Sequence, residues 1–148
     1  MGGRRVKIQV IGLGAGDITQ LPYGIYQKLI QTKQVIYVRT SDHPVITQLK
    51  DADVTFESFD FIYEQYDQFD KVYEHITRIL LEKSQECSVI YAVPGHPMIA
   101  EKTVQLLLEQ DKVDIEIVGG QSFLDDLFTS LHIDPVEGFQ LIDATSIN

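Results

Sequence analysis

The sequence has few of the residues that build disulfides or metal centres. Cys87 is the only cysteine among 148 residues, which excludes an internal disulfide and leaves no thiolate cluster for zinc. Its position beside the apolar run 89–93 indicates a small core residue rather than a nucleophile. The four histidines are widely separated and none forms an i, i+4 pair, so we predict no metal site.

Positive charge is also scarce. The chain has 12 Lys and Arg residues against 22 Asp and Glu, which gives a net charge of −10 and an isoelectric point near 4.6. A nucleic-acid partner needs a basic surface that releases counterions from phosphates, so this composition argues against RNA or DNA binding. The sequence contains neither an apolar stretch of membrane-spanning length nor a signal-peptide h-region. We therefore expect a cytoplasmic protein without a membrane partner.

Apolar periodicity predicts a domain of alternating strands and helices. Hydrophobic residues make up 44% of the chain, enough for a substantial core. Runs with strand character cover residues 8–11, 34–39, 54–58, 88–93 and 113–118. Helical spacing covers residues 22–30, 45–49, 69–80, 98–107 and 123–131, and residues 139–142 indicate a last short strand. Since parallel strands need such crossovers, we predict an open, mainly parallel five-stranded α/β sheet with helices on both faces.

Glycine-bearing loops follow three of the predicted strands. They cover residues 12–17 (GLGAGD), 94–97 (PGHP) and 119–122 (GGQS). Ligands of open α/β sheets bind beyond the carboxyl ends of the strands, and glycine lets the backbone turn sharply and approach a ligand closely. The alternative for a single loop of this kind is a glycine turn that only connects a strand to a helix. Three at the same edge predict a ligand site.

A nicotinamide-dependent oxidoreductase is the alternative that the first loop raises. A dinucleotide fingerprint needs G-x-G-x-x-G and an acidic residue about 20 positions later. Here the third glycine comes one residue early, Asp17 stands where pyrophosphate would dock, and the second strand ends in Arg39. A carboxylate at a helix start repels phosphate, so the sequence disfavours NAD.

The three loops also carry a family resemblance. In order and spacing, residues 11–17, 94–97 and 119–122 resemble the tetrapyrrole (corrin/porphyrin) methylases. Residues 91–97 (YAVPGHP) and 119–125 (GGQSFLD) more narrowly resemble the N-terminal methylase domain of bacterial YabN-type fusion proteins. In those proteins a MazG-type nucleoside triphosphate pyrophosphohydrolase follows the methylase domain. The resemblance covers the whole chain and implies an S-adenosylmethionine-dependent methyltransferase domain of a longer protein.

The resemblance implies two α/β domains with S-adenosylmethionine in the cleft between them. Residues 1–118 would form the N-terminal domain and residues 119–148 the beginning of a truncated second one, so we expect the chain alone to be inactive. A homodimer and a small-molecule methyl acceptor of the tetrapyrrole class are implied as well. Asp17 would face the acceptor as the catalytic residue. The family's cofactor-binding positions fall on Gly14, Ala15, Gly95, His96, Pro97, Met98, Ile99, Gln121 and Ser122.

His96 departs from the family pattern, which has aspartate in Gly-Asp-Pro. A carboxylate there attracts the ammonium or sulfonium of the cofactor, and an imidazole lacks that attraction. Loss of a partly buried ion pair lowers affinity about tenfold to a hundredfold. The alternative interpretation is therefore a catalytically weak or inactive methylase-fold module that serves dimerisation or regulation.

Overall fold

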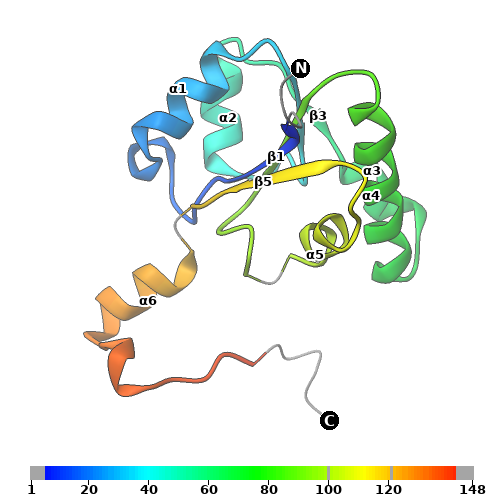
Figure 1. Cartoon of the computed structure of the whole chain (residues 1–148). Coiled ribbons are helices and arrows are strands. Elements are labelled where there is room, and N and C mark those ends of the chain that lie inside the picture. Colours follow the sequence, from blue (N-terminus) through cyan, green and yellow to red (C-terminus); the bar gives the residue numbers. More distant parts are fainter. Residues whose placement is uncertain (1–5, 100, 121, 143–148) are drawn as a thin grey trace, which may run out of the picture.

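The structure, a computed structural model, describes residues 6–99, 101–120 and 122–142. Its five strands form one parallel sheet in the order β3-β2-β4-β1-β5, which confirms the predicted open α/β fold (Figure 1). The strands are β1 Val6–Gly12, β2 Val35–Val38, β3 Glu57–Ser58, β4 Val89–Val93 and β5 Asp114–Val118. The α-helices are α1 Tyr23–Gln31, α2 Pro44–Asp51, α3 Asp60–Gln65, α4 Phe69–Ser84, α5 Lys102–Glu109 and α6 Phe123–Leu131, and the short 3-10 helices are η1 Ile18–Gln20 and η2 Pro135–Glu137. None of the described helices combines the length and the apolar character that a membrane span requires.

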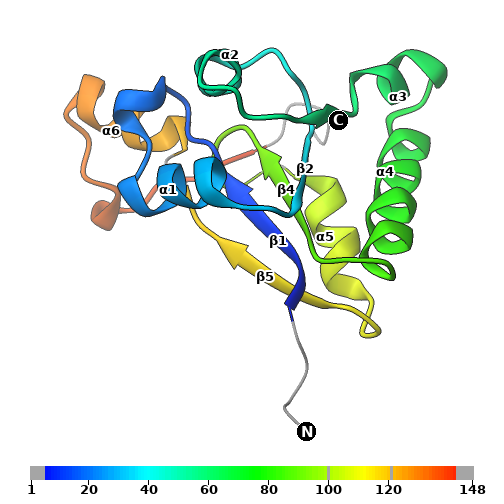
Figure 2. The ribbon, with the colours of Figure 1, turned by 90° about the horizontal axis from the view of Figure 1, so that it is seen from above.

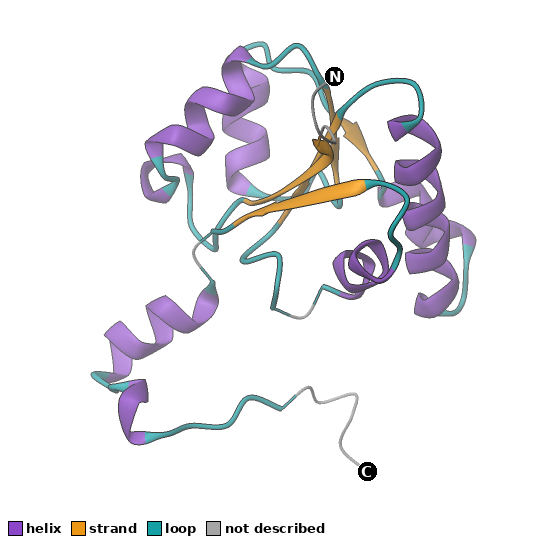
Figure 3. Ribbon diagram, viewed as in Figure 1, coloured by secondary structure: helices purple, strands orange, loops and turns teal. Residues whose placement is uncertain are grey.

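Helices cover both faces of the sheet, as Figures 2 and 3 show. α1 and α2 pack on one face, and α3, α4 and α5 pack on the other. The central strand β4 contributes to both cores, because Tyr91 and Val93 face α4 and α5 while Ile90 and Ala92 face α1 and α2. All five residues of β4 are buried. This two-sided burial explains why the strand is a continuous apolar run in the sequence.

Four details differ from the sequence-based expectations. The strand predicted over residues 54–58 is confined to Glu57–Ser58. Met98 and Ile99 lie in a turn rather than in a helix, and α5 begins at Lys102. The backbone N–H of Met98 is turned back to donate to the ring of His96, which places it outside a helical ladder. Residues 138–142 form no strand, because they lie apart from the sheet, below it in Figure 1, and pair with none of its edges. α3 was not predicted, since six residues give too short a window for helical spacing to stand out.

α6 and the residues after it extend away from the sheet (Figure 1). The rings of Phe128 and Phe139 meet edge to face with centroids 5.4 Å apart. Phe139 is nevertheless exposed, as are six further large apolar side chains of the segment: Leu127, Leu131, Ile133, Val136, Leu141 and Ile142. Exposed apolar side chains gathered in one segment are typical of a face that another domain or chain covers.

The packing of α4 gives a direct test of the core. Leu80 on α4 is fully buried, whereas Leu108 on α5 is 41% exposed. Leu80→Ala should lower the free energy of unfolding by about 2 to 5 kcal/mol, because it removes buried methyl groups and leaves a cavity. Leu108→Ala is the matched control and should cost less than about 1 kcal/mol. Urea denaturation measures both values, and equal losses would contradict the described packing.

Candidate functional site

The loops that follow β1 and β4 are joined to each other by backbone hydrogen bonds. The N–H of Gly14 donates to the carbonyl of Gly95 (3.2 Å), and the N–H of Gly95 donates to the carbonyl of Gly14 (3.0 Å). Gly14 has φ +75° and Gly95 has φ +69°, a left-handed conformation that favours glycine. Leu13 adds a third bond, from its N–H to the carbonyl of Val93 at 2.8 Å. The predicted glycine positions therefore fix two strand ends against each other.

The loop after β5 packs against the same point. A Cβ atom built on Gly120 would lie 2.7 Å from the carbonyl oxygen of Gly12. A Cβ atom built on Gly12 would lie 2.5 Å from the carbonyl oxygen of Gly95 and 2.8 Å from the ring of Pro97. Side chains cannot fit where these backbones meet. The three strand ends predicted to form one site are in direct contact.

His43 attaches a fourth element to this junction. Its Nδ1 accepts from the N–H of Val45 at 3.1 Å, at the start of α2, so the ring proton is on Nε2. Nε2 lies 2.8 Å from the carbonyl oxygen of Gly14 and donates to it. The residue is only 8% exposed. Sequence reasoning gave His43 no role, although its position directly before Pro44 marks it as the residue that precedes the first turn of α2.

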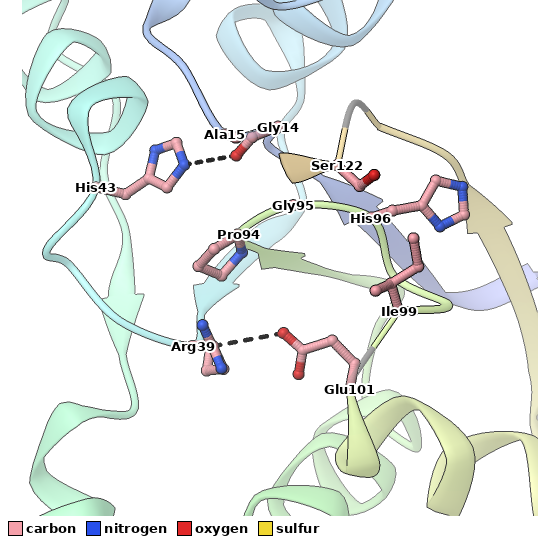
Figure 4. A pocket seen from close by; sticks show the side chains of 10 residues that line it. All are labelled: Gly14, Ala15, Arg39, His43, Pro94, Gly95, His96, Ile99, Glu101 and Ser122. Carbon is pink, nitrogen blue, oxygen red and sulfur yellow. Dashed lines mark hydrogen bonds and ion pairs between the residues drawn. The ribbon is translucent and has the colours of Figure 1, made fainter. Parts of the chain in front are cut away.

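These elements enclose a cavity of about 340 Å³ at the carboxyl edge of the sheet (Figure 4). Six predicted cofactor-binding residues line it: Gly14, Ala15, Gly95, His96, Ile99 and Ser122. Pro97 is buried beside Gly12 and Met98 is 46% exposed, and neither lines the cavity. Gln121 lies outside the described residues. Pro94 also lines it and belongs to the predicted loop 94–97, whereas Arg39, His43 and Glu101 lie outside the predicted loops.

His96 forms the turn that we would expect of the aspartate implied at this position by the resemblance. Its Nδ1 accepts a hydrogen bond from the N–H of Met98 at 3.1 Å, as a carboxylate oxygen would in an Asx turn. Its Nε2 lies 3.2 Å from where a Cβ on Gly119 would be, so the ring packs on the loop after β5. The substitution preserves the turn and removes the negative charge.

Asp17, the predicted catalytic residue, does not line the cavity. It is exposed and precedes η1, where its carboxylate accepts from the backbone N–H of Thr19 at 2.9 Å and from the Thr19 hydroxyl. Both hydrogen bonds from Thr19 lower the pKa of Asp17, and the bond from the hydroxyl has the larger effect. The residue thus serves as a charged cap, and its catalytic role stays a prediction.

Glu101 is the acidic group of the cavity. It is 7% exposed, and its Oε1 lies 3.5 Å from Nε of Arg39 (Figure 4). Burial raises the pKa of Glu101 to about 7, and the positive charge of Arg39 offsets only part of this effect. Behind the pair, the hydroxyls of Tyr63 and Tyr91 and the Nε of Arg39 are buried without a hydrogen-bond partner among the described residues.

Within the same residues, no group of three His, Cys, Asp or Glu side chains is arranged to hold a metal ion.

Sequence comparison matches residues 7–146 to the family Tetrapyrrole (Corrin/Porphyrin) Methylases. A curated relative, the Uncharacterized protein YabN of Bacillus subtilis (strain 168), is 52% identical over 145 residues. The match covers 96% of this chain and 29% of the relative, so the chain spans less than a third of that protein's length.

Solved structures share the fold. The crystal structure of diphthine synthase has a TM-score of 0.64 and 18% identity, covering 87% of this chain and 50% of that one. The structure of uroporphyrin-III C-methyl transferase from Thermus thermophilus complexed with S-adenyl homocysteine has a TM-score of 0.55 and 24% identity. This match covers 86% of this chain and 51% of that one. At these identities the likeness shows the fold alone, and the chain spans about half of each structure.

The contact between Gly12 and Gly120 can be tested by adding one methyl group. In Gly120→Ala the new Cβ must push the loop after β5 away from β1, which should cost about 1 to 3 kcal/mol of unfolding free energy. Gly24→Ala in α1 meets nothing within 4 Å and should instead stabilise the chain by about 0.5 to 1 kcal/mol. Chemical denaturation compares the two variants. Unchanged stability in Gly120→Ala would show that the loops are not in contact.

Glu101 predicts a pH dependence of stability. Its folded pKa of about 7 exceeds the unfolded value of 4.5, so between these values the folded chain keeps a proton that the unfolded chain has released. A rise in pH therefore favours unfolding. We expect the Glu101 contribution to lower the unfolding free energy by about 2 to 3 kcal/mol between about pH 5 and about pH 8. Glu101→Gln should remove this slope in denaturant titrations, and an identical slope in the variant would contradict the assignment.

Proposed function

The chain belongs to the tetrapyrrole (corrin/porphyrin) methylases, and we propose that it forms one wall of an S-adenosylmethionine-binding cleft in a methyltransferase. The observation that carries the proposal is the convergence of three strand ends on one cavity of about 340 Å³. The structural neighbour complexed with S-adenyl homocysteine supports the choice of cofactor. The proposed contacts come from Gly14, Ala15, Gly95 and Ser122.

The glycine loops suit a donor that must come close to the backbone. Nothing lies within 4 Å of where a Cβ on Gly95 would be, so this position borders open space. Ser122 lies at the start of α6, where its hydroxyl accepts from the N–H of Leu124 at 3.1 Å and is held in place. A wall fixed in this way would orient the donor so that the methyl group passes from sulfur to an in-line acceptor nucleophile. Positioning of this kind accelerates a reaction without covalent catalysis.

We propose that the second wall comes from a longer protein. The curated relative is more than three times as long as the match, and the surface around α6 exposes apolar side chains that a further domain would cover. In this arrangement residues 1–118 are the first methylase domain, residues 119–148 begin the second, and a MazG-type pyrophosphohydrolase follows. A tetrapyrrole-class acceptor, with Asp17 facing it, and assembly as a cytoplasmic homodimer belong to the same proposal.

His96 favours a second candidate function. Because the family's loop carboxylate is absent at this position, the domain would bind the cofactor weakly or not at all and act as a module for dimerisation or regulation. The two candidates differ in one measurable quantity, the affinity of the full-length protein for S-adenosylmethionine.

Calorimetry with S-adenosylmethionine and S-adenosylhomocysteine tests the proposal. The full-length protein should bind both stoichiometrically, and the 148-residue chain should bind at least about tenfold more weakly, because the cost of immobilising the ligand remains when half of the contacts are removed. Folding of each protein is checked by circular dichroism. Failure of the folded full-length protein to bind either ligand would support the non-catalytic module, and equal affinity in the two proteins would show that one wall is a sufficient site.

A further inference from the structure

One end of the cavity presents a positive and a negative side chain together. Arg39 follows β2 and is anchored by its backbone N–H, which donates to the carbonyl of Ala92 at 3.1 Å. Glu101 immediately precedes α5, where the helix dipole favours a carboxylate. The two side chains come from segments 62 residues apart (101 − 39) and meet because β2 and β4 are neighbours in the sheet. The fold therefore places an oppositely charged pair of side chains at one end of the cavity.

The two charges are incompletely satisfied by each other. Nε of Arg39 and Oε1 of Glu101 are 3.5 Å apart, and Nε makes no hydrogen bond in the described part of the chain. The Glu101 side chain is 6% exposed and that of Arg39 is 33% exposed, so solvent reaches part of the Arg39 side chain and hardly reaches Glu101. Burial of a charge with one distant partner is costly. Burial raises the pKa of Glu101, and the nearby charge of Arg39 opposes only part of this effect.

The surroundings define which ligand would satisfy both groups. Among the described residues, Arg39 is the cationic side chain that acts on the carboxylate of Glu101, and the uncharged hydroxyls of Tyr63 on α3 and Tyr91 on β4 also lie near this carboxylate. A simple cation would pair with Glu101 and face repulsion from Arg39, while a simple anion would face the reverse. A zwitterion with adjacent ammonium and carboxylate groups complements both charges at once.

We infer that the Arg39–Glu101 pair is the subsite for the zwitterionic amino-acid end of the methyl donor. The inference rests on the proposed function. The donor's ammonium binds Glu101 and its carboxylate binds Arg39. Each of the two side chains then has a charge-assisted hydrogen bond to the donor in place of the long contact between them. Glu101 thereby supplies from the start of α5 the negative charge that His96 does not supply from the loop.

The affinities of three ligands distinguish the contribution of this subsite from that of the rest of the cleft. S-adenosylmethionine carries the sulfonium and the amino-acid end, S-adenosylhomocysteine carries only the amino-acid end, and 5′-methylthioadenosine carries neither. Calorimetry uses the full-length protein and the variants Glu101→Gln and Arg39→Met. Glu109→Gln, at the exposed last residue of α5, is the control with the same charge change.

Glu101→Gln and Arg39→Met should each weaken S-adenosylhomocysteine and S-adenosylmethionine by about tenfold to a hundredfold and change 5′-methylthioadenosine by less than about twofold. Glu109→Gln should change none of the three. The inference is overturned if S-adenosylhomocysteine binds the two variants as tightly as it binds the wild type. Weakened binding of S-adenosylmethionine alone would also overturn it, because Glu101 would then contact the sulfonium. Equally weakened binding of 5′-methylthioadenosine would overturn it as well, because the two residues would then have a general structural role. Absence of binding of S-adenosylmethionine and S-adenosylhomocysteine to the wild type would instead overturn the proposed function, and the inference with it.

Discussion

The site depends on the close approach of three backbones at the carboxyl edge of the sheet. Gly12 and Gly120 touch where no side chain fits, and Gly14 and Gly95 exchange two hydrogen bonds in a conformation that favours glycine. The cavity depends on the absence of side chains at these four glycines and on the backbone hydrogen bonds between Gly14 and Gly95. His43 extends the same junction to α2, so the start of this helix holds the first loop in place.

The carboxylates of Asp17 and Glu101 have opposite environments. Asp17 is exposed, accepts hydrogen bonds from Thr19 and stays charged as a cap of η1. Glu101 is buried beside Arg39 with a pKa near neutrality, so its charge depends on what occupies the cavity. This difference gives Glu101 the stronger case for direct contact with a charged ligand, and it leaves Asp17 well placed to hold the geometry of the first loop.

Local sequence signals predicted the fold and the loops that border the cavity. The apolar run of β4 and the glycine loops indicate buried parallel strands and their ligand-facing ends. The cofactor-binding residues came from the family resemblance, and six of them line the cavity. Arg39 and Glu101 could not be found in this way, because their meeting depends on the pairing of β2 with β4 and on two long side chains. The predicted strand at residues 139–142 failed for a related reason: apolar alternation signals a strand only where the sheet offers an edge, and this segment lies away from it.

The central claim is that the ends of β1, β4 and β5 act as a single ligand-binding wall. Titration of the ¹⁵N-labelled chain with S-adenosylhomocysteine, followed by amide chemical shifts, tests it most directly, because NMR detects weak binding. The account predicts that the amides of Gly14, Ala15, Gly95 and Ser122 shift together and fit one dissociation constant. Shifts confined to one loop or centred on the outer face of α4, or no shifts at millimolar ligand, would contradict it.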